Sequence, residues 1–261
     1  MGIAKALKSA TRDLRRKIFQ SSGVRASNAP KPSRRPSYDY WALYGRGGLR
    51  LALAFFRECH AFDLARGTDT HTELPDTKYA FAPENFARGS WYLGSWTSEL
   101  LNSFAVVTEY LGADFHNYAF VDVGCGKGKA LLVWKENLNK LKIPSTVVGI
   151  EYYEPLAVIA QRNCKKLFER PASIFVCDAT QFDFWQLGDK LIIYMFHPFD
   201  DVIMCKFLEN LRGLKTIIIY NNPVHKGVVL DFGYSVIYQK TGWHLMQSTT
   251  IFASEDLAKT R

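Results

Sequence analysis

Phe-Val-Asp-Val-Gly-Cys-Gly-Lys-Gly-Lys occupies residues 120–129 and decides the fold of this chain. An apolar run over 119–123 leads into it, and an amphipathic segment over 128–140 follows it. A strand, a glycine-rich turn and a helix in this order let the backbone of the turn approach a ligand closely, while the first N–H groups of the helix face the same ligand. The stretch therefore predicts a nucleotide-like binding site.

The spacing of the glycines narrows the class of nucleotide. The dinucleotide fingerprint is G-x-G-x-x-G, whereas here glycines fall at 124, 126 and 128 and an acid, Asp122, stands two residues before the first. A phosphate-binding G-x-x-x-x-G-K-[ST] loop is also absent, since Ala130 follows Lys129. Both alternatives are disfavoured.

Two further acids follow the next two apolar runs. Glu151 ends the run over 146–151, where a carboxylate can accept hydrogen bonds from both ribose hydroxyls. Asp178 follows the run over 173–177 and is placed to accept a hydrogen bond from an adenine amino group. Three acids after three successive strands predict a site for a nucleoside.

The rest of the chain alternates short apolar runs with amphipathic segments, which predicts a parallel sheet built from βαβ units. The runs lie at 119–123, 146–151, 173–177, 191–196, 216–220, 234–239 and 244–253, with helices expected at 128–140, 154–168 and 200–212. Only four residues separate the last two runs, too few for a parallel crossover, so these should pair antiparallel.

The glycine turn, the three acids and the terminal hairpin together resemble the class I S-adenosylmethionine-dependent methyltransferases over residues 119–253. The motif D-V-G-C-G-K-G-K at 122–129, with Gly-Thr-Asp-Thr at 67–70 ahead of it, also resembles the motifs of a little-characterised group of these enzymes. The resemblance implies an α/β, Rossmann-like, doubly wound core with a seven-stranded sheet, S-adenosylmethionine as methyl donor and S-adenosylhomocysteine as product. It also implies cofactor contacts from these residues: the methionine end at Asp122, Gly124, Cys125, Gly126 and Gly128, the ribose at Glu151, and the adenine at Asp178 and Ala179.

The acceptor side is read from the segment after the fourth run. Methyltransferases that act on amino groups of nucleic-acid bases carry Asn or Asp, two prolines and an aromatic here, but His197-Pro198-Phe199 lacks the amide and the second proline. Base methylation is therefore disfavoured. His197 is the candidate catalytic base, for a hydroxyl or amine acceptor, against the alternative that it only caps the loop by hydrogen bonding. His225 is a second candidate, while Asn221 and Asn222 are expected to serve a turn.

Residues 38–118 form an expected N-terminal cap ahead of the methyltransferase domain at 119–261. It should hold helices near 48–60 and 97–112 and a polar loop at 67–73. Several polar and aromatic residues of the cap are candidates to fold over the cofactor, although packing or turn roles are favoured for each: Asp69, His71, Tyr92, Trp96 and Thr97. Inside the glycine turn, Cys125 is expected to be a small packing residue rather than a nucleophile.

Positive charge is confined to the N-terminus. The formal net charge is +8, but residues 1–35 hold ten Lys or Arg against one acid, Asp13, which leaves the remainder close to neutral. Residues 3–19 show the pattern of a basic amphipathic helix, and a linker rich in proline and serine extends to 37. We expect this segment to bind an anionic membrane surface peripherally, to act as an organellar transit segment, or to remain a solvated or dimer-contacting tail.

Composition bounds the remaining alternatives. Five cysteines without zinc-ligand spacing favour a reducing, cytoplasmic location and no bound metal, with an organelle matrix as the alternative. The near-neutral body and the altered motif at 197–199 disfavour nucleic acid as substrate. The expected acceptor is therefore a small molecule, a glycan or a lipid-linked compound. A protein lysine and a non-catalytic module that keeps the cofactor fold are the alternatives.

Overall fold

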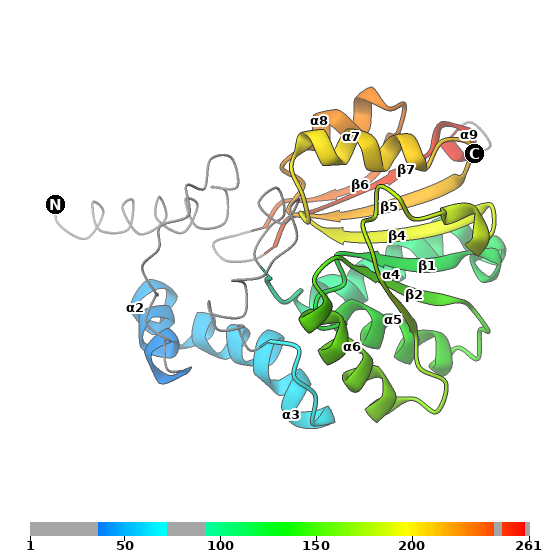
Figure 1. Cartoon of the computed structure of the whole chain (residues 1–261). Coiled ribbons are helices and arrows are strands. Elements are labelled where there is room, and N and C mark those ends of the chain that lie inside the picture. The colour runs from blue at the N-terminus through cyan, green and yellow to red at the C-terminus, as the bar shows by residue number, and fades with distance from the viewer. Residues whose placement is uncertain (1–35, 72–91, 243–246, 259–261) are drawn as a thin grey trace, which may run out of the picture.

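A computed structural model describes residues 36–71, 92–242 and 247–258. Its centre is a seven-stranded sheet with the order β3-β2-β1-β4-β5-β7-β6 (Figure 1). The strands are β1 (Ala119–Val123), β2 (Val147–Glu151), β3 (Ser173–Val176), β4 (Lys190–Phe196), β5 (Lys215–Asn221), β6 (Ser235–Lys240) and β7 (Thr249–Ala253). The first five pair in parallel, and β7 pairs antiparallel with both β5 and β6. The predicted doubly wound fold with an antiparallel end is confirmed.

Helices cover both faces of the sheet. One face carries α4 (Thr97–Leu111), α5 (Lys129–Lys140) and α6 (Glu154–Leu167), and the other carries α7 (Asp201–Asn210), α8 (Lys226–Asp231) and the 3₁₀ turn η5 (Phe184–Leu187). A second 3₁₀ turn, η4 (Gly112–Asn117), leads into β1, and α9 (Glu255–Ala258) follows β7. Strands covered on both faces need nearly continuous apolar sequence, which is why β1 reads as an uninterrupted buried run.

The helix α4 belongs to the core rather than to a separate cap. Its buried residues share one apolar cluster with β1 and α5, in which Phe104 lies 4.9 Å from Trp134 between ring centroids. Trp134 in turn stacks on Phe120 of β1 at 4.0 Å. In the part of the chain that the structure describes, the segment 36–71 joins this cluster through Phe62, and the rest of that segment forms an outer layer with the strip 92–96.

That outer layer is a bent helical arm. It consists of α2 (Pro36–Phe55), the π-helical turn η1 (Phe56–Ala61) and α3 (Phe62–Arg66), and it lies beside the carboxyl ends of the parallel strands (Figure 1). The arm bends at Gly47 and Gly48, whose backbone angles leave the helical region. The helix expected at 48–60 thus begins just after this bend, and it continues through η1 and α3 to Arg66. The basic helix expected at 3–19 lies outside the described residues, as does most of the linker.

Candidate functional site

The glycine turn between β1 and α5 has a backbone that only glycine adopts readily. Gly124, Gly126 and Gly128 have φ of +70°, +54° and +85°. Each also faces a close neighbour: a Cβ would lie 2.9 Å from Pro198 at Gly124, 2.2 Å from the Tyr92 ring at Gly126, and 3.1 Å from Ala160 at Gly128. Packing within the chain thus already requires these glycines, a reason that the sequence did not reveal.

The side chain of Cys125 packs against β2. It is buried, and its Sγ lies 2.8 Å from the position that a Cβ on Gly149 of β2 would occupy. Burial, with nearby Asp122 and Glu151 adding to it, raises the pKa of its thiol well above the ordinary value. A thiol held protonated in this way is a poor nucleophile, so the turn offers no thiolate for covalent chemistry.

Two buried carboxylates flank the turn. Glu151, at the end of β2, accepts hydrogen bonds from the backbone N–H of Gly126 at 2.7 Å and of Tyr153 at 2.8 Å, through one oxygen each. Asp122 on β1 is 3% exposed, and among residues 36–71, 92–242 and 247–258 no donor reaches its side chain. Burial raises the pKa of both groups, and for Asp122 the charge of Glu151 raises it further. A buried carboxyl group beside a second acid is costly to ionise, so Asp122 suits a ligand that brings donors or positive charge.

Asp178 and Ala179 lie at the end of the edge strand β3. One oxygen of Asp178 accepts from both the backbone N–H and the hydroxyl of Thr180 at 2.8 Å, which shapes the turn after the strand. Ala179 is buried in the apolar cluster on the α7 face. The parallel order β3-β2-β1 brings Asp178, Glu151 and Asp122 to one edge of the sheet, as the sequence predicted.

The Gly-Thr-Asp-Thr segment at 67–70 packs directly on the glycine turn. Asn163 of α6 accepts from the N–H of Asp69 at 3.2 Å and donates to the carbonyl oxygens of Asp69 and Lys127 at 2.9 and 3.0 Å. Asp63 accepts from both threonine hydroxyls and from the N–H of Thr70. The hydroxyl of Tyr92, whose ring covers Gly126, donates to the carbonyl oxygen of Thr70. Asp69 and Tyr92 thus hold the segment 67–70 against the glycine turn.

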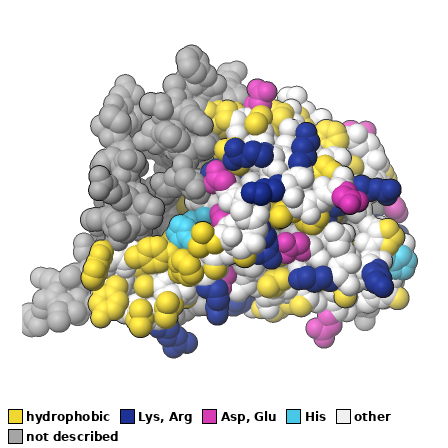
Figure 2. Space-filling model, turned by 90° about the horizontal axis from the view of Figure 1, so that it is seen from below, with side chains coloured by type: hydrophobic (Ala, Val, Ile, Leu, Met, Phe, Trp, Pro, Cys, Tyr) yellow, Lys and Arg dark blue, Asp and Glu magenta, His cyan; other side chains and the backbone are white. Residues whose placement is uncertain are grey.

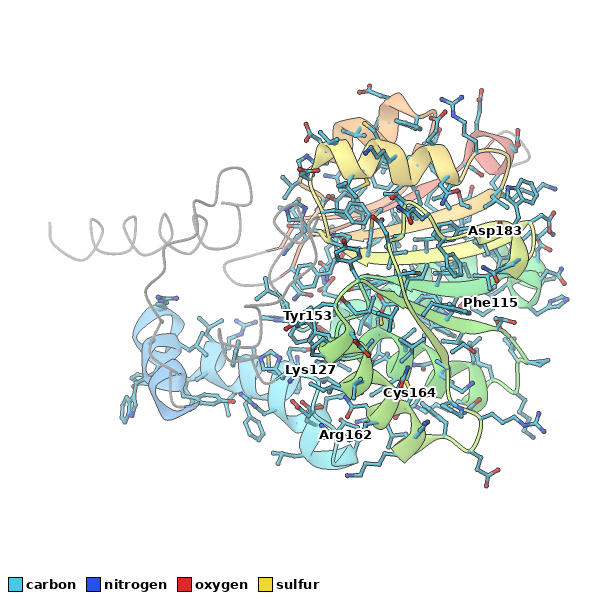
Figure 3. The ribbon with its side chains drawn as sticks, in the orientation of Figure 1. Phe115, Lys127, Tyr153, Arg162, Cys164 and Asp183 are labelled. Carbon is cyan, nitrogen blue, oxygen red and sulfur yellow. The ribbon has the colours of Figure 1, made fainter. Side chains whose placement is uncertain are left out.

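Two buried lysines hold the segment 36–71 at the same place. Lys127 is 1% exposed and pairs with Asp69 at 2.9 Å, and Arg162 approaches the other oxygen of Asp69 at 3.8 Å. Figure 3 shows Lys127 and Arg162 where the core meets the N-terminal helices. Lys129 donates to the carbonyl oxygen of Glu58 at 2.5 Å, and burial lowers its pKa to about 8. Both lysines hold the segment 36–71, a role that their position in a glycine-rich turn did not reveal.

His197 follows β4 and lies beside a second histidine. It is buried with φ of +40°, and its Nδ1 lies 3.2 Å from the hydroxyl of Tyr220. The hydroxyl of Tyr220 also accepts from the N–H of His225 at 3.4 Å, and the two histidine rings are 5.3 Å apart. Burial, with a smaller effect of His225, lowers the pKa of His197 to about 4. The imidazole is therefore neutral at neutral pH.

A buried polar chain ties the strip 94–96 to the sheet. Asn221, at the end of β5, donates to the hydroxyl of Tyr194 at 3.0 Å and to Oε1 of Gln247 at 2.7 Å. Tyr194 donates to Ser95, and Gln247 accepts from the N–H of Trp96. Asn221 was expected to serve a turn, and Trp96 was a cofactor-cap candidate. The linking residue, Gln247, carries no motif that would have singled it out.

The remaining cap candidates lie near this region without forming a second site. The hydroxyl of Thr97 donates to the carbonyl oxygen of Glu58 at 3.5 Å. His71 packs with its ring 5.2 Å from that of His60, and burial lowers its pKa to about 3. Among the described residues, no group of three or more His, Cys, Asp or Glu side chains is arranged to hold a metal ion. No helix in the described ranges is long and apolar enough to cross a membrane.

Neither a family model nor a curated protein matches this sequence. Solved structures do match. Magnesium protoporphyrin IX methyltransferase from Synechocystis PCC 6803, with bound SAM, is 14% identical, with 77% of this chain and 95% of that chain covered and a TM-score of 0.44. A SAM-dependent methyltransferase from Aquifex aeolicus is 13% identical, with 60% and 97% covered and a TM-score of 0.42. LepI in complex with SAM is 14% identical, with 57% and 46% covered and a TM-score of 0.44. Likeness at this level concerns the fold alone.

Proposed function

We propose that this protein is an S-adenosylmethionine-dependent methyltransferase that methylates a hydroxyl or amine of a small-molecule, glycan or lipid-linked acceptor. The observation that carries the proposal is the pair Asp122 and Glu151. Two buried carboxylates stand beside a glycine turn at the carboxyl edge of a parallel sheet, and one of them lacks a donor among the described residues. The fold alone supports many activities, so these side chains have to carry the argument.

The hydrogen-bond acceptors of the site suit this cofactor. Asp122 and the turn 124–128 would hold the methionine end, where the amino group brings the donors and positive charge that Asp122 lacks. Glu151 uses one lone pair of each oxygen on backbone N–H groups, and a carboxylate has further lone pairs for the ribose hydroxyls. Asp178 and Ala179 would flank the adenine. When bound, S-adenosylmethionine supplies an activated methyl group, and its loss to an acceptor nucleophile leaves S-adenosylhomocysteine.

His197 is the proposed proton acceptor. A neutral oxygen that gains a methyl group becomes a strongly acidic oxonium, which even an imidazole with a pKa of about 4 can deprotonate. An alkylammonium holds its proton far more tightly. His197 therefore suits a hydroxyl acceptor better than an amine. This role requires the tautomer in which Nδ1–H donates to Tyr220, so that Nε2 is the acceptor.

The test is to follow the methyl group. Full-length protein is incubated with donor carrying a radiolabelled methyl and with fractionated cell lysate, and the label is traced to glycan, lipid, small molecule, protein or RNA. We expect label in the first three classes, and less of it with His197→Asn, since asparagine tolerates the positive φ at this position. Label entering RNA would contradict the acceptor class. Label on protein lysine would favour the alternative that the acceptor is a protein lysine.

The non-catalytic alternative predicts a different pattern. A module that only binds a partner would show no transfer to any fraction while still binding the cofactor. Against it stands the free-energy cost of Asp122, because burial and the nearby Glu151 disfavour its ionised form and a ligand with positive charge would offset that cost.

A further inference from the structure

The N-terminal arm presents an apolar face that the fold leaves exposed. Figure 2 shows hydrophobic side chains gathered over the N-terminal helices. Trp41 is 75% exposed, Leu49 62% and Leu64 72%. The other members of this arm face are Tyr44, Leu53 and Phe56, all exposed as well. Single exposed apolar residues are ordinary, but six on one short arm mark an interaction surface.

The arrangement of the arm explains why this face is exposed. Leu43, Leu51, Cys59 and Phe62 are buried, so the arm already has an inner side. The intervals between Leu49, Leu53 and Phe56 are four and three residues, which places these three side chains along one line of a helix. The arm is therefore apolar on two sides, whereas a helix that only packs on a core needs one.

Positive charges flank this face between residues 40 and 67. In this interval the exposed charged side chains are Arg46, Arg50 and Arg57, of which Arg57 pairs with the buried Glu58 at 3.2 Å. Among the acids of the same interval, Glu58 is buried and pairs with Arg57, and Asp63 is half-buried and accepts from Thr68 and Thr70. Arginines beside tryptophan, tyrosine, leucine and phenylalanine are the composition of helices that lie in the interface of an anionic membrane.

We propose that the arm face, comprising Trp41, Tyr44, Leu49, Leu53, Phe56 and Leu64 with its flanking arginines, docks on an anionic lipid surface. A second copy fits less well, since a two-fold interface would set the same arginines against one another and the described residues 40–67 offer no exposed acid to separate them. The segment 3–19 fits less well for the same reason, because it is itself basic. The arm also begins at Pro36, where the basic segment 1–35 joins the structure, so both would meet the same negative surface.

The proposal does not depend on methyl transfer and is tested without it. At low salt, full-length protein is sedimented with vesicles of phosphatidylcholine alone and with vesicles that contain roughly 30% phosphatidylglycerol. Leu49→Glu/Leu53→Glu removes apolar contact from the exposed face, and Val158→Glu/Val202→Glu is the matched control on exposed positions of α6 and α7. Thermal unfolding checks that each variant folds.

We expect wild type and the control to pellet with the anionic vesicles and not with the neutral ones, and the arm variant to bind at least tenfold more weakly. Equal binding of the arm variant and the control would overturn the proposal. Equal binding to both kinds of vesicle would overturn the anionic partner. A concentration-dependent dimer that the arm variant abolishes, without any vesicle binding, would assign the face to a second copy instead.

Discussion

Asp122 places function and stability in opposition at a single carboxyl group. Its pKa is raised by burial and by Glu151, so the folded state favours the protonated form. A raised acid pKa contributes stability that is present below about pH 4 and is lost as pH rises through the folded pKa. Asp122→Asn should therefore stabilise the fold by about 1–3 kcal/mol near pH 8 and by less near pH 4.

The same change should weaken binding of S-adenosylhomocysteine, because the amide offers neither the charge nor the second acceptor oxygen. Urea unfolding at the two pH values, with a calorimetric titration at pH 8, checks both effects. A variant that is less stable and binds unchanged would show that Asp122 is satisfied within the chain.

His197 has the opposite pH dependence. Burial lowers its pKa from 6.5 to about 4, so it contributes stability that is present above about pH 6.5 and is lost as pH falls through about 4. At about 1.4 kcal/mol for each pKa unit, the loss amounts to about 3 kcal/mol. His197→Asn should remove that part of the acid sensitivity. Unfolding free energies at pH 7 and pH 4 provide the measurement, and equal losses in wild type and variant would contradict the assignment.

Among the elements, α6 holds the segment 67–70 mainly through Asn163, with Arg162 and Lys166 contacting the same segment. Asn163 makes three hydrogen bonds to the backbones of Asp69 and Lys127. Asn163→Ala should cost about 2–3 kcal/mol and should speed amide hydrogen exchange at 67–71. Asn139→Ala, at an exposed position of α5, is the matched control. If the two variants are equally stable, the cap is held by other contacts.

The elements also show where sequence reasoning succeeds. Long buried runs identify parallel strands because both faces of such a strand are covered, so β1 has the predicted bounds and β4 and β5 differ only at their ends. The arm was harder to predict. Its helix is interrupted at Gly47 and Gly48, and the carbonyl oxygen of Glu58 in its π-helical turn accepts from the distant Lys129, neither of which periodicity predicts. The helix α8 has only six residues.

Some residues of the candidate site could also be predicted from the sequence, and others could not. Asp122, Glu151 and Asp178 could be placed from the sequence because each lies in the last two residues of a strand or just after it, and parallel strands end at one edge. The roles of Lys127, Asn163 and Gln247 could not, because each depends on a contact across 25 or more residues that no local pattern encodes.

At the scale of the whole molecule, the basic segment 3–19 is expected to add a second membrane contact to that of the arm. Each Lys or Arg near an anionic leaflet contributes about 1 kcal/mol. Lys5→Gln/Lys8→Gln/Lys17→Gln in the full chain should therefore weaken vesicle binding by roughly a hundredfold at low salt. The control replaces three exposed lysines of the core: Lys140, Lys206 and Lys215. If the variant and the control bind alike, the segment has another role, and a shortened N-terminus on protein recovered from cells would identify it as a transit segment.

The central claim is that the edge formed by Asp122, Glu151 and Asp178 binds S-adenosylmethionine and its product. Isothermal titration of the full chain with S-adenosylhomocysteine tests it most directly. The matched pair is Glu151→Gln, at the proposed ribose contact, and Glu154→Gln, an exposed acid at the start of α6. We predict that S-adenosylhomocysteine binds saturably to wild type and to Glu154→Gln, and at least tenfold more weakly to Glu151→Gln. We predict no binding of NAD to wild type. Absence of binding to wild type, preference for NAD, or equal affinity of the two variants would contradict the account.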